Sequence, residues 1–250
     1  MAFSNSAKRV LGILDLFSTE YPEYGVTQAA QSLGMNKSTV ARIMSTLEKK
    51  GALKKNTENR KYRLGAKVCN WTRVFNETLD LKFIAKPYLK KLSMNTGLSS
   101  AVMIVDGDKR LCLDATESTH MLRLQQIPGA HHPLHAGAAG KLLLAYIPEE
   151  KRNQMLARSG LPRFTARTIT RMNDLQKELD RIQKQGYAVS SGEYVELAVS
   201  LFAPVRDYSG EVVAAIGIAG LTSQFMPEEQ LKYVDIVTEV AMELSRETGY

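Results

Sequence analysis

The stretch from Val26 to Gly51 limits most strongly what this 250-residue chain can fold into. Its sequence, VTQAAQSLGMNKSTVARIMSTLEKKG, predicts two helices joined by a tight turn. We expect Thr27 to cap the first helix and Gly34 to end it, because glycine adopts a left-handed C-terminal conformation without steric strain. Asn36 suits the N-cap of the second helix, which ends at Gly51. Apolar residues recur at helical spacing in both: Ala29, Ala30, Leu33, Val40, Ile43, Met44 and Leu47.

The opposite face of the second helix is polar. Its side chains are donors of the kind that reach phosphates and base edges when a recognition helix enters the major groove: Lys37, Ser38, Thr39, Arg42, Ser45, Thr46 and Lys49. An ordinary amphipathic helix with a solvated face would show the same residues, because helix–turn–helix spacing alone is a weak pattern. The segment that follows helps to separate these two interpretations.

Residues 52–64, ALKKNTENRKYRL, predict two short strands around a turn at Asn56–Arg60. Residues 36–63 contain nine Lys or Arg and only two Glu. A helix–turn–helix followed directly by a basic hairpin of the winged type favours DNA binding.

The sequence of the winged module predicts which part of DNA each side chain contacts. We expect Arg42 to contact bases, because a guanidinium paired with guanine is the commonest specific contact. Lys37 and Lys61 are expected at phosphates, and the hairpin tip along the backbone or in the adjacent minor groove. The full set of predicted DNA-binding residues is Thr27, Asn36, Lys37, Ser38, Thr39, Arg42, Asn59, Arg60 and Lys61.

Charge is distributed unevenly along the chain. The net charge is +7. Residues 1–65 hold eleven Lys or Arg against five Asp or Glu, whereas the remainder holds twenty-two against twenty-one. A basic N-terminal module on a neutral body indicates a polyanionic partner for the first part only.

The composition is that of a globular protein. The chain is 44% hydrophobic and 24% charged, and its length suits two modest domains. No apolar run reaches the length of a membrane span, and the N-terminus lacks the apolar core of a signal peptide, so we expect a cytoplasmic protein that contacts no membrane. Cys69 and Cys112 have neither metal spacing nor a pairing pattern, which favours reduced packing residues.

Two helices flank the winged module in the predicted order. Residues 4–18 predict a capped helix that completes a three-helix core. Residues 67–79 predict a connecting helix with Trp71 on one face, and either packing on its own chain or a dimer interface would explain an aromatic residue there. The expected domains are therefore 1–65, a linker helix at 66–80, and 81–250.

Residues 81–250 predict an antiparallel sheet flanked by helices, which makes the whole chain α+β. Helices are expected over 81–95, 138–147, 149–158, 171–185 and from Pro227 to about Arg246. Strands are expected over Ser99–Val105, Leu111–Thr116, Met121–Ile127, Ala198–Val205 and Val212–Leu221, with a loop at Pro128–Pro133.

Five segments resemble the IclR family of bacterial transcription regulators. They are the N-terminal module, PLHAGAAGKLLLAYIP (133–148), FTARTIT (164–170), GYAVSSGEY (186–194) and LFAPVRDYSGEVVAAIGIAG (201–220). The resemblance runs in order over nearly the whole chain. It implies a winged helix–turn–helix, a linker helix and a GAF-like domain that binds a small effector. It also implies homodimers, often paired as dimers of dimers on operator DNA.

The resemblance also implies where an effector binds. The turn before the helix at 138 contacts the effector in the family, which carries over to Ala138 and Ala139. Relatives that bind small carboxylates tend to have an acidic residue, a cysteine and two hydroxyls at the positions of Ser190, Ser200, Gly217 and Ala219. Smaller, less polar side chains here predict a larger and less polar effector, aromatic or amide-like. Met121 and Leu124 are expected to form an apolar wall and His132 the mouth, although Arg123 or His132 can instead supply a charge contact for a carboxylate.

Other chemistries fit the sequence less well. GAAGK at 137–141 lacks the residues of a nucleotide-binding loop, and the spacing of His131, His132 and His135 is not that of a metal site. Glu193 and Glu196 have no nucleophile motif beside them, so we expect solvated loop residues. We therefore predict no enzyme, no cofactor and no metal.

The predicted function is a ligand-responsive transcription regulator, with repression favoured over activation, that controls a catabolic or transport operon. The alternative is an architectural DNA-binding protein whose C-terminal domain only oligomerises. A ligand that stabilises the protein would separate the two.

Overall fold

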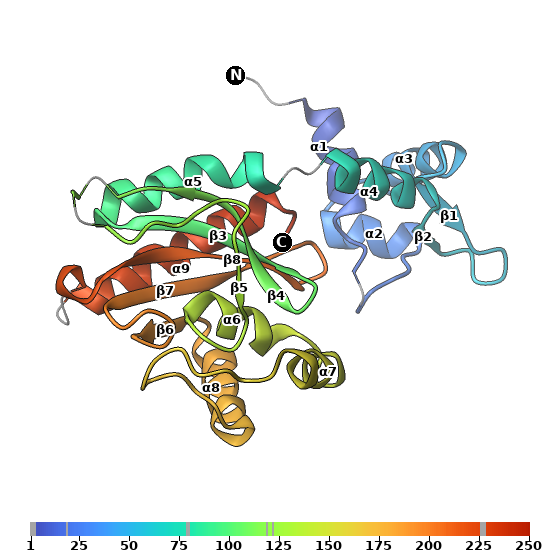
Figure 1. Ribbon diagram of the computed structural model, residues 1–250. Coiled ribbons are helices and arrows are strands. Elements are labelled where there is room, and N and C mark those ends of the chain that lie inside the picture. Colours follow the sequence, from blue (N-terminus) through green and yellow to red (C-terminus); the bar gives the residue numbers. More distant parts are fainter. Residues whose placement is uncertain (1–3, 19, 79–80, 119, 122, 226–228) are drawn as a thin grey trace. The chain divides into compact units, whose positions relative to one another are not determined.

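The structure is a computed structural model that describes residues 4–18, 20–78, 81–118, 120, 121, 123–225 and 229–250 (Figure 1). The chain divides into two compact units, Met1–Leu79 and Asp80–Tyr250. No helix in the described part of the chain has the length and apolarity to cross a membrane.

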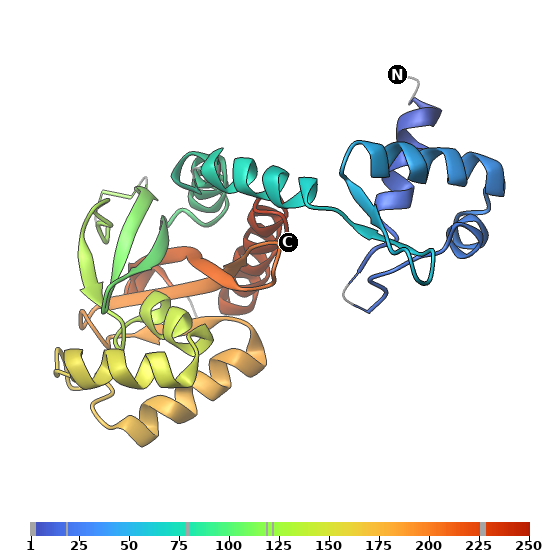
Figure 2. The same ribbon diagram turned by 90° about the vertical axis from the view of Figure 1, so that its right-hand side faces the viewer.

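The first unit is a three-helix core with a hairpin. Helices α1 (Asn5–Leu14), α2 (Val26–Leu33) and α3 (Lys37–Lys49) are followed by strands β1 (Leu53–Lys55) and β2 (Tyr62–Leu64) and by helix α4 (Lys67–Thr78). Figure 2 shows the hairpin as an extension beside the helices. The core consists of apolar residues from all three helices, together with one residue of each strand: Ile13, Ala29, Ala30, Val40, Met44, Leu53 and Tyr62.

The residues at the ends of α1 and α2 show how each helix is capped. Gly34 closes α2 with φ of 60°, as expected for a left-handed C-cap. The expected cap at Thr27 is wrong: α2 begins at Val26, and Gln28 accepts a hydrogen bond from the Gly25 amide at 3.1 Å, so Thr27 lies inside the first turn. The first helix is shorter than the predicted 4–18 and ends at Leu14.

The hairpin is tied to the preceding loop. Tyr24 and Tyr62 exchange two backbone hydrogen bonds, at 2.9 and 2.8 Å, which adds one residue to the edge of β2. The hairpin tip turns where Arg60 has φ of 60° and donates its amide to the Asn56 carbonyl. Gly65 then passes close to the end of α3, because a Cβ at this position would overlap the Gly51 carbonyl oxygen.

The second unit is built on a six-stranded antiparallel sheet of order β5-β4-β3-β8-β7-β6. The strands are β3 (Ser99–Asp106), β4 (Lys109–Thr116), β5 (His131–Pro133), β6 (Ala188–Ser191), β7 (Ala198–Arg206) and β8 (Val212–Leu221). The adjacent strands β7 and β8 are the longest and most apolar, in line with their burial on both faces.

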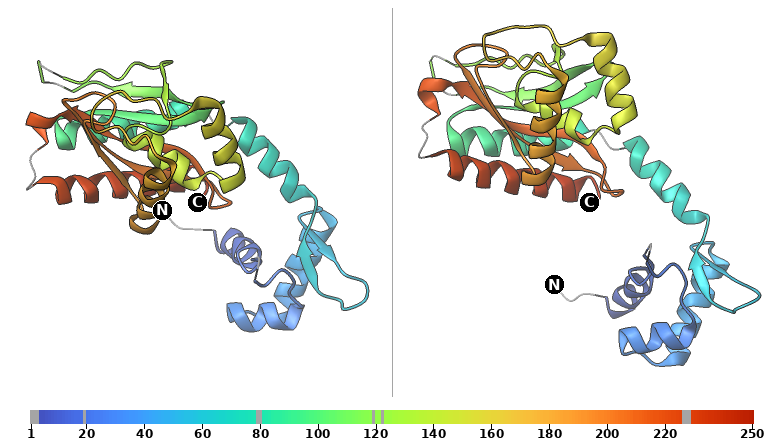
Figure 3. Two further views of the ribbon diagram at one scale, coloured as in Figure 1. Left: turned by 60° about the horizontal axis from the view of Figure 1, so that its bottom comes forward. Right: turned by 90° about the horizontal axis from the view of Figure 1, so that it is seen from below.

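Helices cover both faces of the sheet. Helices α5 (Leu81–Thr96) and α9 (Gln230–Glu247) pack side by side on one face (Figure 3). Helices α6 (Ala138–Tyr146), α7 (Glu149–Ser159) and α8 (Met172–Gln185) lie on the other face. Side chains that alternate along β7 divide between the two cores, with Leu201 on the first and Phe202 on the second. A short 3₁₀ turn, η1 (Thr222–Gln224), follows β8.

Three sequence expectations for this unit fail. Residues 121 and 123–127 form no strand, although Leu124 and Gln126 alternate inward, because the segment pairs with no neighbouring strand. The third strand is instead β5, inside the predicted loop, where Leu111 pairs with His131. Strand β6 was not predicted, because its four residues are too few to show a period. The last helix begins at Gln230, and the predicted start at Pro227 lies outside the described residues.

The close approach at Gly65 generates a stability prediction. Gly65→Ala should destabilise the first unit by about 1–3 kcal/mol, because its methyl group overlaps backbone that cannot move away. Gly12→Ala is the matched control, since its Cβ would lie 3.7 Å from Leu33 and the helix should gain about 0.5–1 kcal/mol. Hydrogen–deuterium exchange of peptides from residues 5–78 of the full chain measures both. Equal protection in the two variants would contradict the prediction.

Candidate functional site

The polar face of α3 is accessible. Lys37, Ser38, Arg42 and Thr46 are exposed and Thr39 is half-buried, whereas Val40 and Met44 on the opposite face are fully buried. The Thr46 hydroxyl donates back to the Arg42 carbonyl at 2.8 Å. Asn36 precedes α3 in extended conformation and is exposed, as is Thr27 at the start of α2. The predicted helix residues therefore reach solvent along one side.

The hairpin tip presents further polar groups. Arg60 is exposed and Lys61 half-buried. The Asn59 side chain is already engaged, because its amide donates to Glu23 at 2.9 Å and its oxygen accepts the Lys61 amide at 2.9 Å. Asn59 thus shapes the turn that displays Arg60 and Lys61.

The second unit contains a cavity of about 140 Å³ between the N-terminus of α6 and the sheet. Of the nine predicted effector residues, seven line it: Leu124, His132, Ala138, Ala139, Ser190, Ser200 and Ala219. Sequence reasoning missed further lining residues, notably Met103, Arg110, Glu193, Tyr194 and Phe202.

Two predicted effector residues lie elsewhere. The Met121 side chain is 98% exposed and does not line the cavity, so the expected apolar wall at Met121 is wrong. Gly217 pairs with Phe202 in the neighbouring strand, and a Cβ there would lie 2.7 Å from the Phe202 ring. The same Cβ would lie 2.1 Å from the Leu201 carbonyl oxygen, so the absent side chain at 217 makes room for the neighbouring strand and this ring rather than for an effector.

The N-terminus of α6 opens onto the cavity. Gly137 takes φ of 84°, a conformation that favours glycine, and turns the chain from Ala136 into the helix. The Ala138 amide donates to the Ser200 hydroxyl at 3.4 Å, and the Gly137 amide to Glu193 Oε2 at 3.4 Å. The positive end of the helix dipole therefore faces this wall of the cavity.

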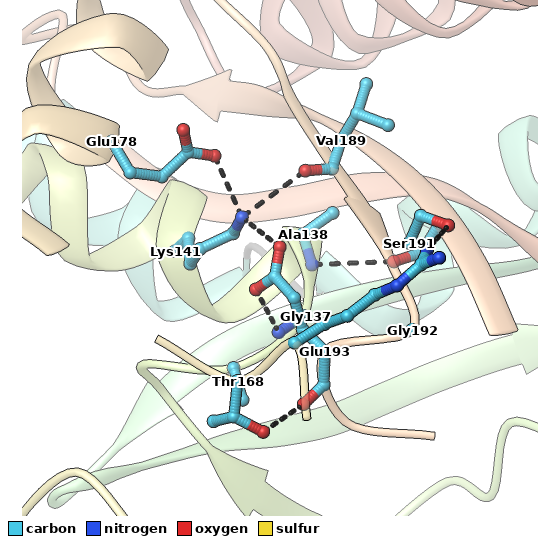
Figure 4. Close-up of polar contacts among 12 residues, drawn as sticks. Gly137, Ala138, Lys141, Thr168, Glu178, Val189, Ser191, Gly192 and Glu193 are labelled. Carbon is cyan, nitrogen blue, oxygen red and sulfur yellow. Dashed lines mark hydrogen bonds and ion pairs between the residues drawn. The ribbon is translucent and has the colours of Figure 1, made fainter. Parts of the chain in front are cut away.

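A buried ion-pair network holds that wall in place (Figure 4). Lys141 is 1% exposed, and its Nζ lies 2.8 Å from Glu178 Oε1 and 2.5 Å from Glu193 Oε1. Burial raises the pKa of Glu178, but hydrogen bonds from Arg181 and Lys141 outweigh it and hold that pKa below its ordinary value. Glu193 is only 12% exposed, which corrects the expectation of a solvated loop residue. Glu196 is exposed, as expected.

Arg110 is the main cavity residue that sequence reasoning missed. It lies on β4 and is 7% exposed, and its Nη1 donates to the Ala136 carbonyl at 2.6 Å. Its Nε is buried with no hydrogen-bond partner in the described part of the chain. Burial lowers the pKa of Arg110 to about 10, so the guanidinium stays charged at neutral pH. One signal was available: Arg110 alternates in phase with the buried Cys112.

An aromatic cluster borders the cavity through His132 and Tyr194. The Tyr194 ring makes edge contacts with His132 and Phe164, at centroid distances of 5.6 and 4.9 Å, and the Arg110 guanidinium lies 5.7 Å from the Tyr194 ring. His132 Nδ1 is buried and has no hydrogen-bond partner within the described residues. Burial, then the nearby Arg110, lowers the pKa of His132 to about 4.

The three histidines at positions 131, 132 and 135 have different surroundings. His131 Nε2 lies 2.7 Å from Asp106, and His135 Nε2 lies 3.0 Å from the Pro162 carbonyl. Among the residues that the structure describes, no group of three or more His, Cys, Asp or Glu is placed to hold a metal ion. Arg123, considered as a charge contact for the effector, instead pairs with Glu117 at 2.6 Å and does not line the cavity.

A winged helix–turn–helix joined to a sheet domain that contains a small cavity is the architecture of a transcription regulator with a ligand-binding domain. Residues 75–246 match the family described as bacterial transcriptional regulator IclR C-terminal, and residues 6–57 match the IclR helix-turn-helix domain. The chain belongs to the IclR family of bacterial transcription regulators, which confirms the resemblance found in the sequence. Its homologues regulate transcription and are not enzymes.

Individual relatives match over most of their length. The chain is 30% identical to the HTH-type transcriptional regulator XynR of Escherichia coli, over 100% of this chain and 99% of XynR. It is 27% identical to the HTH-type transcriptional repressor AllR of Klebsiella pneumoniae, over 98% of this chain and 90% of AllR.

Solved structures share the fold. A putative IclR-type regulator from Silicibacter sp. TM1040 has a TM-score of 0.88 at 23% identity, over 98% of this chain and 96% of that one. An IclR homologue from Microbacterium hydrocarbonoxydans, solved in complex with 4-hydroxybenzoate, has a TM-score of 0.62 at 21% identity, over 97% and 98%. These likenesses confirm the predicted α+β architecture.

The Lys141 network generates a second stability prediction. Lys141→Met should lower the free energy of unfolding by about 3–5 kcal/mol, because Glu178 and Glu193 would remain buried without their cation. Lys91→Met is the matched control. Lys91 pairs with Glu243 but is 41% exposed and screened by solvent, so its replacement should change the free energy of unfolding far less. Urea denaturation of the full chain measures both, and similar losses in the two variants would refute a structural role for the buried network.

Proposed function

We propose that this protein is an effector-responsive repressor of a catabolic or transport operon. It acts in the cytoplasm as a homodimer, or as a dimer of dimers, on double-stranded operator DNA. The observation that supports the proposal most directly is the cavity beside the N-terminus of α6, in a chain that also carries a winged DNA-binding module. An architectural protein that only oligomerises has no need of such a cavity.

The proposed DNA contacts follow from α3 and the hairpin. α3 enters the major groove with Lys37, Ser38, Thr39 and Arg42 toward the DNA, while its apolar side holds the core. Arg42 reads a base, and Arg60 and Lys61 lie along the phosphates or the neighbouring minor groove. Paired modules dock at fixed spacing, so the operator is nearly palindromic.

The proposed effector is a small organic metabolite with an aromatic or weakly polar body. A cavity of about 150 Å³ in another protein core holds one benzene molecule, and the cavity here has a similar volume of about 140 Å³. Phe202, Met103 and Leu124 contribute apolar surface to it. The ligand of the Microbacterium homologue has one ring.

Coupling between effector binding and DNA binding requires two arrangements of the dimer that differ in their affinity for the effector. The linker at 66–80 is the proposed transmitter. On α4, Trp71 is 45% exposed with its ring beside Lys67, and aromatic side chains of this kind are enriched at interface centres. Repression, rather than activation, has support from the relative AllR, which is named a repressor.

The recognition proposal predicts different effects for two basic residues. Arg42→Ala should weaken operator binding by about 1–3 kcal/mol and relax sequence preference at one base pair. Lys61→Ala should weaken operator and random DNA alike, and reduce the salt slope by about one. Fluorescence anisotropy over a salt series measures both variants, on an operator selected by the wild-type protein from random-sequence DNA. Equal losses on operator and random DNA for Arg42→Ala would exclude its role in base recognition.

Effector response separates a ligand-responsive regulator from an architectural protein. In the same anisotropy assay, an effector should raise the operator Kd by roughly 5–150-fold, the usual range of allosteric coupling. Random DNA is the control, because phosphate contacts made in either arrangement should change less. If compounds bind the full chain, as seen by calorimetry, yet none changes operator affinity, the regulatory proposal fails. If none binds, the architectural alternative replaces it.

A further inference from the structure

We infer that Glu23, in the loop before α2, is a positioning residue for DNA binding. It braces the tip of the hairpin, residues 56–61, in the orientation that brings Arg60 and Lys61 to DNA. The inference rests on the proposed function, from which it takes the contacts between the hairpin and DNA. It adds a residue that acts on those contacts from outside the hairpin.

The hairpin tip is held by its own hydrogen bonds. The Asn56 amide donates to the Lys61 carbonyl at 2.8 Å, and the Asn56 carbonyl accepts the Arg60 amide at 3.1 Å. The Asn56 side chain also accepts the Glu58 amide at 2.9 Å. Arg60 has φ of 60°, the one positive value at a non-glycine residue in the described part of the chain. Non-glycine residues adopt this conformation where surrounding contacts impose it, so the direction of Arg60 within the tip is fixed.

These bonds do not fix the tip to the rest of the first unit. The Tyr24–Tyr62 backbone pair ties the base of the hairpin to the loop before α2. Farther out, Asn59 Nδ2 donates to Glu23 Oε2 at 2.9 Å. Among the residues that the structure describes, this is the one hydrogen bond from a side chain of the tip to a residue outside the hairpin. The Asn59 oxygen meanwhile accepts the Lys61 amide at 2.9 Å, so one side chain joins the brace to the backbone that carries Lys61.

The charge of Glu23 makes the inference testable by its sign. Within the described residues, no Lys, Arg or His nitrogen lies within ion-pair distance of the Glu23 carboxylate, and its bond to Asn59 leaves it charged. A carboxylate in a basic module repels DNA phosphates, so on charge alone its removal should tighten DNA binding. An ionised acceptor also makes a stronger hydrogen bond than a neutral one, which suits a brace. If Glu23 positions the tip, its removal should weaken DNA binding instead.

Fluorescence anisotropy of the full chain on a random-sequence DNA duplex measures this sign. Glu23→Met should raise the Kd by roughly threefold to tenfold, the usual net effect of one hydrogen bond. Glu23→Gln removes the same charge but keeps an oxygen that accepts from Asn59, so its Kd should not exceed that of the wild type. Glu58→Met is the matched control. Glu58 is an exposed carboxylate of the same tip, its side chain has no hydrogen bond or ion pair among the described residues, and its loss should lower the Kd.

An exchange of donor and acceptor tests the contact itself. Asn59→Asp keeps the oxygen that accepts the Lys61 amide but places two carboxylates against each other, so the Kd should rise. Adding Glu23→Gln supplies an amide donor opposite the new carboxylate and restores the formal charge of the wild type. The double variant should recover most of the lost affinity, which independent effects of the two substitutions would not produce.

The results separate the inference from the proposed function. If Lys61→Ala leaves the Kd unchanged, the hairpin does not contact DNA, and both fail. If Lys61→Ala weakens binding while Glu23→Met tightens it as Glu58→Met does, the inference is overturned and the proposed DNA contacts stand. If Glu23→Met lowers the melting temperature of the full chain, the exchanged pair decides: recovery in the double variant supports the brace, and a Kd that stays high overturns it.

Discussion

The second unit depends on one buried ammonium group. Lys141, on α6, joins α8 through Glu178, β6 through the Val189 carbonyl, and the loop after β6 through Glu193. These three segments come from places between 37 and 52 residues farther along the chain. Because the interior disfavours any unpaired charge, all three must be in place together, and the same contact holds Glu193 over the α6 terminus. The contacts of Lys141 therefore both pack this wall and shape the cavity.

Sequence patterns predicted most of the fold because its signals are local. The Gly34 turn, the helical spacing of Val40 and Met44, and the alternation in β7 and β8 each depend on a few neighbouring residues. Failures occurred where no local rule applies. Residues 123–127 alternate like a strand but have no partner, and the three residues of β5 pair only because Leu111 lies opposite His131. Strand formation there is decided by tertiary contacts.

The cavity was predicted less completely, and for a related reason. The resemblance placed Ala138, Ser190 and Ser200 at the cavity, but its charged groups depend on contacts between distant segments. Glu193 was expected to be solvated because nothing near it in the sequence reveals Lys141. Arg110 follows a turn, where charged residues are common, and only its phase with Cys112 indicated burial. The prediction for Met121 failed in the opposite sense. Its apolar side chain was expected to line the cavity from a strand, but the described residues there form no strand and the side chain is exposed.

The pairing of Gly217 with Phe202 fixes one wall of the cavity through the backbone as well as through a side chain. Phe202 lines the cavity, and a Cβ at 217 would lie 2.7 Å from its ring and 2.1 Å from the Leu201 carbonyl oxygen. A smaller residue at 202 would remove the contact with the ring but not the overlap with the backbone. Any side chain at 217 would therefore force β7 and β8 apart. The position of this wall is set by the spacing of two paired strands, which makes it a rigid part of the cavity.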